Sequence, residues 1–203
     1  MEKKEFGPLI EGLLADPLGV NSFPKLIDFM RRKAAPQLRK VAFESMIAGE
    51  KFTQEDDVFY MVGSNPTEQE RQTAQKLEKA GFFVVFPGKG QIEAIKQLEG
   101  DSNKRKNDCY IYDKKTYAQS KVDLKSSGEP SVESIAYHIS SGSGQAPVIA
   151  LDITGNISKR NLIAGIRSGW SKGIKEVLIN YKGQWYSADK KKTFSKWIEL
   201  NLK

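Results

Sequence analysis

The chain has 203 residues, of which 39% are hydrophobic and 28% charged, which predicts a globular protein with room for one substantial core. No apolar run approaches the roughly 18 residues that a membrane span needs. One cysteine, Cys109, excludes an intramolecular disulfide and a multi-cysteine zinc site, and the single histidine, His138, argues against a histidine-based zinc site.

The positive charge is unevenly distributed along the chain. Residues 101–203 carry 18 Lys and Arg against 10 Asp and Glu, a net charge of +8. Residues 1–100 carry 14 against 15, a net charge of −1. A basic half predicts an anionic partner, most often nucleic acid, although many basic proteins bind none.

The first quarter of the chain reads as helical. Over residues 8–50, apolar residues recur three and four apart, with Pro and Gly as breaks. A loop with acids, "TQEDD" at 53–57, follows. We therefore expect a helical N-terminal extension over residues 1–60, with no assignable chemistry, and a second domain over 61–203.

A well-delimited helix is predicted over residues 64–81. Ser64, Asn65 or Thr67 can cap its start, acids crowd its first turn, and Gly81 ends it. Beyond it, strands and helices alternate. We expect strands at 82–88, 108–112, 120–126, 146–153 and 175–181, a hairpin return at 183–188, helices at 129–142 and 158–173, and a short helix with a basic loop over 90–107. This order predicts an α/β fold with a mixed central sheet flanked by helices.

The strand around Leu124 carries charges on one side. Because a strand alternates its faces, Asp123 and Lys125 point the same way and Leu124 points into a core. Another acid, Asp108, stands fifteen residues earlier at the start of the preceding strand. Two carboxylates and an ammonium group on one side of a hairpin are either a metal site or a solvated face with a weak salt bridge.

"ND" at 107–108 followed by "VDLK" at 122–125 resembles the PD-(D/E)XK nuclease superfamily, with Asn107 in place of the usual proline. Within that superfamily the chain is most similar to nuclease toxin domains of contact-dependent inhibition systems and related polymorphic toxins. The resemblance covers about residues 66–203 and includes "ERQTAQKLEKAGFFVVF", "GSGQAPVIALDI" and "GIKEVLINYKGQW". An acid-x-lysine element alone is a weak signal, but this ordered set in an αβββαβ core is much more specific.

The resemblance implies a divalent metal site for phosphodiester hydrolysis. Asp108, Asp123 and the main-chain carbonyl of Leu124 would hold Mg²⁺ or Mn²⁺, which prefer oxygen ligands. Lys125 would orient the attacking water or neutralise developing negative charge. Glu70 matches the acid that the family places on the helix before the first strand, as a ligand or a water-positioning group. Alternatively, Glu70 complements the helix dipole.

Other residues are expected to contact the substrate. Gln145 stands where similar toxin domains carry a glutamine that reaches a phosphate or the attacking water; the alternative is a helix-end residue. Nucleic-acid contacts are expected from Lys104, Arg105, Lys106, Ser126, Lys172 and Trp185. Trp185 would stack on an unpaired base or, alternatively, close a core. We interpret Asp152 as structural, and His138 as a surface or half-buried residue rather than a catalytic base.

These expectations together predict a metal-dependent nuclease. By the resemblance it is a bacterial or phage-borne toxin that cleaves RNA, with tRNA the leading substrate, in the cytoplasm of a target bacterial cell. An acidic immunity protein would then block its basic groove. The alternatives are a DNA endonuclease of the same superfamily, or a non-catalytic nucleic-acid-binding or phage structural module.

Overall fold

The computed structural model describes residues 36–93, 107–189 and 198–199. Its elements alternate between helices and the strands of one nine-stranded sheet, whose spatial order follows the chain from β1 to β9. In chain order they are α3 (Pro36–Gly49), β1 (Phe52–Glu55), β2 (Val58–Met61), α4 (Glu68–Lys79), β3 (Phe82–Phe86), β4 (Cys109–Asp113), β5 (Gln119–Ser127), α6 (Val132–Gly142), β6 (Val148–Ile153), α7 (Lys159–Gly169), β7 (Glu176–Tyr181), β8 (Gln184–Asp189) and β9 (Ile198–Glu199).

The sheet is mixed. β2 pairs in parallel with β3, and β5, β6 and β7 pair in parallel with one another, whereas the remaining neighbours are antiparallel. Each parallel pair is joined by a helix, because a parallel connection must return to the end at which the first strand began. α4, α6 and α7 make these three connections. The predicted α/β fold with a mixed sheet is confirmed.

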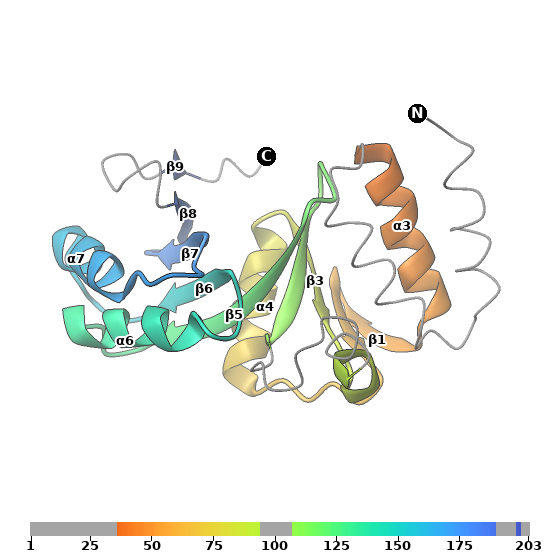
Figure 1. Ribbon diagram of the computed structural model, residues 1–203, viewed down its shortest axis with the longest axis horizontal. Coiled ribbons are helices and arrows are strands. Elements are labelled where there is room, and N and C mark those ends of the chain that lie inside the picture. The colour runs from red at the N-terminus through yellow and green to blue at the C-terminus, as the bar shows by residue number, and fades with distance from the viewer. Residues whose placement is uncertain (1–35, 94–106, 190–197, 200–203) are drawn as a thin grey trace.

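The helices cover both faces of the sheet. α4 packs on one face, where Leu77 meets Leu124 of β5 and Trp185 of β8. α6 and α7 pack on the opposite face through Ile135 and Leu162. α3 covers that same opposite face over β2, β3 and β4, so it stands at one end of the sheet while α6 and α7 stand at the other (Figure 1).

The capping residues set the limits of α4. The backbone N–H of Glu70 donates to Thr67 Oγ1 at 3.3 Å, and the N–H of Thr67 donates to Glu70 Oε2 at 2.6 Å. This reciprocal pair is a capping box, which satisfies two N–H groups at the helix start. At the other end Gly81 has a φ of +88°, a conformation that glycine adopts without strain. The helix predicted within residues 64–81 is confirmed.

The N-terminal region departs from the prediction. α3 is helical as expected, but β1 and β2 form a hairpin where we expected an acidic loop. β2 is buried and pairs with β3, so the predicted domain boundary between residues 60 and 61 falls inside a strand of the sheet. β1 escaped detection because three of its four residues are exposed, which removes the alternating apolar pattern. The predicted helices before residue 36 and most of the loop at 90–107 lie outside the described residues.

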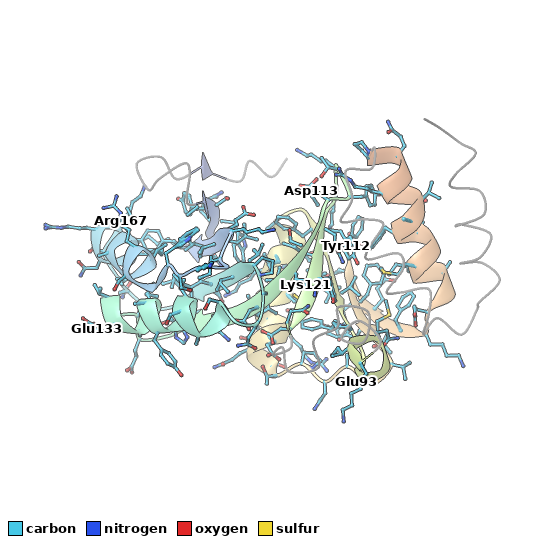
Figure 2. The ribbon with its side chains drawn as sticks, viewed as in Figure 1. Glu93, Tyr112, Asp113, Lys121, Glu133 and Arg167 are labelled. Atoms are coloured by element: carbon cyan, nitrogen blue, oxygen red, sulfur yellow. The ribbon has the colours of Figure 1, made fainter. Side chains whose placement is uncertain are left out.

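α3 is part of the core. The ring of Phe43 lies 4.8 Å from the ring of Phe83 and 4.8 Å from that of Tyr112. Tyr112 lies between the sheet and α3 (Figure 2), and its hydroxyl donates to Met46 Sδ at 3.6 Å. Within the described residues, no helix combines the length and apolar character that crossing a membrane requires.

Truncating Phe43 tests whether α3 belongs to this core. Phe43→Ala should lower the free energy of unfolding by about 3–5 kcal/mol, because it leaves a cavity among packed aromatic rings. Val41→Ala, on the exposed side of the same helix, should change it by less than about 0.5 kcal/mol. Urea unfolding of both variants measures the difference. Equal stabilities would mean that α3 does not pack on the sheet.

Candidate active site

β5 extends past the start of its neighbour. It pairs with β4 only over Gln119–Val122, because β4 begins at Cys109. The following residues of β5, through Ser127, continue to pair with β6 on the other side. Within the described sheet, residues 123–127 therefore have an open edge where β4 would otherwise lie.

Asp108 closes part of this open edge with its side chain. Its backbone N–H donates to the carbonyl of Val122 at 3.1 Å, and its Oδ2 accepts the N–H of Leu124 at 2.7 Å. The N–H and C=O of one strand residue point to the same side, so the carbonyl of Leu124 also faces this edge. A carboxylate and a main-chain carbonyl are thus directed to one place.

Asp108 and Asp123 lie on the same face of the sheet. Cys109 and Val122 pair directly, so their side chains share one face of the sheet. Asp108 precedes Cys109 and Asp123 follows Val122, so both aspartates lie on the other face. Lys125 shares the face of Asp123, and its Nζ lies 2.8 Å from Asp123 Oδ2. Leu124 points oppositely into the core beneath α4, as the alternation predicted.

The carboxylate of Asp123 is fully buried and incompletely satisfied. Its relative exposure is 0%, and neither oxygen has a hydrogen-bond partner among the described residues. The contact with Lys125 supplies opposite charge but lacks hydrogen-bond geometry. Gly142 of α6 packs against Oδ2 so closely that an added Cβ would lie 2.4 Å from it. A buried charge with free lone pairs is costly unless a further ligand occupies them.

Two further acids act on the pKa of Asp108. Burial above all, and then the nearby carboxylates of Asp123 and Glu70, raise this pKa to about 7, although the N–H of Leu124 acts to lower it. Burial raises the pKa of the Cys109 thiol, and Asp108, Glu70 and Asp123 all add to that effect. Glu70 therefore lies near the aspartate pair from the N-terminus of α4.

Glu70 caps the start of α4 and also lines a pocket beside β5. Its carboxylate accepts the N–H of Thr67 in the capping box, which is the structural alternative. It also lines a pocket of about 160 Å³ that wraps around the open edge of β5. The residues that line this pocket include Glu70, Thr73, Leu124, Lys125, Ser126 and His138.

His138 is a pocket residue that the sequence did not assign to the site. Burial lowers the pKa of its imidazole, Lys125 lowers it further, and Asp123 opposes this. His138 therefore lies near the Lys125–Asp123 ion pair. Its spacing of four residues from Gly142 places both on one face of α6, and this spacing was the available signal.

Two other predicted contacts, Gln145 and Lys172, do not line this pocket. Gln145 sits in the turn after α6, where its N–H donates to the carbonyl of Gly142 at 2.9 Å, and it is not among the residues lining the pocket. Lys172 is exposed in the turn between α7 and β7. Lys104, Arg105 and Lys106 lie outside the described residues.

The prediction that Trp185 stacks on a base is wrong. Its ring is 4% exposed in the core beneath α4, and its indole N–H donates to the carbonyl of Lys76 at 3.1 Å. Trp185 closes the core, which was the alternative. Asp152 is structural as expected, because Lys76 Nζ contacts its Oδ2 at 2.6 Å and the Asn180 amide donates to its Oδ1 at 2.8 Å.

The donor set at the open edge is compatible with a hard divalent ion. Within the described part of the chain, no group of three or more His, Cys, Asp and Glu side chains is arranged to hold a metal. Mg²⁺ needs fewer, because it keeps several waters and binds through one or two carboxylates plus substrate oxygens. Asp108, the oxygens of Asp123, which lack hydrogen bonds, and the carbonyl of Leu124 fit Mg²⁺ or Mn²⁺ and do not fit a structural zinc site.

Comparisons with known proteins add one likeness. No protein-family model matches the sequence, and no curated protein matches it. Among solved structures, the chain is similar to one described as "CdiA-CT/CdiI toxin and immunity complex from Burkholderia pseudomallei". The two share 21% identity over 69% of this chain and 96% of the other, with a TM-score of 0.41. At that TM-score the likeness supports no inference about function.

Neutralising Asp108 tests whether burial and the neighbouring carboxylates penalise its negative charge. Because the pKa of Asp108 is raised in the folded protein, folding favours its protonated form. This contribution to stability is complete below about pH 4 and is lost as the pH rises through about 7. Without divalent ions, Asp108→Asn should therefore raise the melting temperature at pH 8 by at least about 2–4 °C, the shift that 1 kcal/mol gives a chain of this size. The gain should shrink towards pH 4.

Thermal unfolding from pH 4 to pH 8 in EDTA measures this effect. Glu129→Gln removes an exposed carboxylate and is the matched control, for which no pH-dependent gain is expected. An identical pH dependence for wild type and Asp108→Asn would show that the pKa of Asp108 is raised neither by burial nor by the neighbouring carboxylates.

Proposed function

We propose that this protein is a metal-dependent nuclease that hydrolyses phosphodiester bonds. The observation that carries the proposal is the convergence of Asp108 and Asp123, with Lys125 beside them, at the open edge of β5. A solvated strand face, the alternative, would leave these side chains exposed. Instead, Asp123 is fully buried and its two oxygens lack hydrogen bonds.

Asp108, Asp123 and the carbonyl of Leu124 are the proposed ligands, with Glu70 a further candidate. A divalent ion held there would polarise the scissile phosphoryl group and lower the pKa of a bound water. The protein's own contribution is positioning. The Leu124 N–H holds the Asp108 carboxylate at the edge, and Gly142 leaves room for the carboxylate of Asp123.

Lys125 is the proposed electrostatic stabiliser. Its ammonium group lines the pocket and is anchored by Asp123, so it meets negative charge that develops on the phosphoryl oxygens or orients the attacking water. His138 lines the same pocket. Its lowered pKa keeps the imidazole neutral near pH 7, and in that form it accepts a hydrogen bond from water or a sugar hydroxyl. Gln145 remains a predicted phosphate or water contact.

The proposed substrate is nucleic acid, with RNA ahead of DNA. The net charge of +8 over residues 101–203 favours a polyanion. An ion acting on the phosphate meets the same group in RNA and in DNA, so the site chemistry does not distinguish them. The preference for RNA, with tRNA as the leading substrate, comes from the sequence resemblance to nuclease toxin domains. A DNA endonuclease and a non-catalytic binding module are the alternatives.

The resemblance also supplies the proposed biological setting. A toxin of this kind would act in the cytoplasm of a target bacterial cell. The producing cell then requires an immunity protein, and an acidic one would complement the basic surface. A cognate partner that proved strongly basic would contradict this electrostatic complementarity.

Two substitutions separate metal binding from charge stabilisation. Asp123→Asn should abolish cleavage of total RNA in Mg²⁺, because it removes a ligand and with it the ion's effect on the transition state. Lys125→Ala should retain the ion and lower the rate by about 100-fold or more, the scale of losing one electrostatic stabiliser. Both should still bind RNA, because phosphate attraction over the whole basic half sets that affinity.

The measurement is cleavage and binding by each variant at one salt concentration, on total RNA and on plasmid DNA, in Mg²⁺ and in Mn²⁺. Lys115→Ala, an exposed lysine in the β4–β5 turn, controls for the loss of one positive charge. Wild-type rates in both site variants would identify a solvated face. A wild-type protein that cuts neither polymer with either ion would favour the binding module.

A further inference from the structure

A second pocket lies at the other end of α4. It measures about 450 Å³ and sits on the same sheet face as α4, at the carboxyl ends of β6 and β7. Carboxyl ends of parallel strands are frequent ligand sites in α/β sheets. The polar residues that line it are Lys76, Lys79, Asp152, Thr154, Asn180 and Gln184.

The floor of this second pocket is a fixed polar pair. Asp152 and Asn180 lie directly opposite each other on β6 and β7 and are both buried. Both oxygens of Asp152 have partners, one the ammonium group of Lys76 and the other the Asn180 amide. Because a carboxylate only accepts hydrogen bonds, Asn180 must direct its NH₂ group to Asp152. The orientation of the amide is thereby set.

Asn180 Oδ1 is left without a hydrogen-bond partner among the described residues, although it is buried. An unsatisfied buried acceptor costs about 1–3 kcal/mol, so native proteins rarely retain one without a reason. The missing partner is a donor, an N–H or an O–H. The hydrogen phosphate dianion has one O–H, but that donor sits on the same small group as the negative charge.

The rim of the pocket favours an anionic group, in addition to the hydrogen-bond donor that Asn180 Oδ1 lacks. Lys79 is exposed and forms no ion pair within the part of the chain that the structure describes, so its ammonium group is available to an anion. A ligand that fits the pocket therefore carries an anionic group and, a short distance away, a hydrogen-bond donor. A nucleotide combines both, a phosphate and the N–H groups of its base.

The two pockets are close enough to share one nucleic-acid strand. Glu70 of the first and Lys76 of the second are six residues apart on α4, which is about 9 Å along the helix axis. Ser126, which lines the first pocket, pairs directly with Asp152, which lines the second. We propose that the second pocket is a nucleotide subsite of the nuclease, with Lys79 on a phosphate and Asn180 Oδ1 accepting from a base N–H. This inference rests on the proposed nuclease function.

Nucleotide binding tests the subsite without any cleavage. The side-chain amide of Asn180 and the indole N–H of Trp185 report on the pocket in ¹⁵N NMR spectra of the wild type, recorded in EDTA. Nucleoside monophosphates should shift both signals, whereas inorganic phosphate should not. Lys79→Gln should weaken nucleotide binding about fivefold, the scale of one exposed charge contact, and Lys115→Gln should leave it unchanged.

Three results would overturn the subsite: no shift with any nucleotide, an equal shift with phosphate alone, or a shift produced only by an acidic peptide such as oligoglutamate. The last would identify a protein-docking pocket.

Steady-state cleavage then tests the link to the first pocket. Lys79→Gln should raise KM about fivefold for a 12-nucleotide RNA and leave kcat and dinucleotide cleavage unchanged. An unchanged KM in Lys79→Gln would contradict the subsite but not the nuclease function. A wild-type protein that never cleaves RNA would contradict the nuclease function, whereas the nucleotide-binding result would still hold.

Discussion

The extension of β5 beyond the start of β4 is the constraint on which the site depends. Because β4 begins at Cys109, the second half of β5 has a strand on one side only. The open edge exposes main-chain groups that a sheet would otherwise pair, and Asp108 satisfies one of them with its carboxylate. The same edge gives α4 and α6 access to β5 from opposite faces, so that Glu70 and His138 line one pocket. A complete β4 would remove the site.

Two buried aspartates in neighbouring strands differ in how completely the protein satisfies their oxygens. Asp152 is 2% exposed, and a lysine and an asparagine satisfy its two oxygens. Asp123 is equally buried, yet its oxygens have no hydrogen bonds and only the charge of Lys125 beside them. An acid that serves stability is saturated by the protein. In the proposed nuclease, Asp123 keeps lone pairs for a ligand, at a cost that the rest of the core must offset.

The sequence predicts the parts of this arrangement that depend on local chemistry. Thr67 and Gly81 delimit α4, and alternation places Asp123 with Lys125 and buries Leu124. It does not predict the features that depend on strand register or on packing between distant elements. The β1–β2 hairpin has an exposed edge strand with no apolar pattern, and His138 enters the pocket only because α6 crosses β5. Trp185 lies beside lysines in the sequence, but its place in the sheet puts it in the core.

The central claim is that the open edge of β5 binds a divalent ion between the two aspartates. A crystal structure of the wild-type protein with Mn²⁺, measured for anomalous scattering, tests it most directly. The account predicts an anomalous peak within about 2.0–2.6 Å of oxygens from Asp108 and Asp123 and of the Leu124 carbonyl, and no such peak in Asp123→Asn. A peak elsewhere, or an ordered Asp108–Asp123 pair that shares a proton with no ion in saturating Mn²⁺ at pH 8, would contradict it.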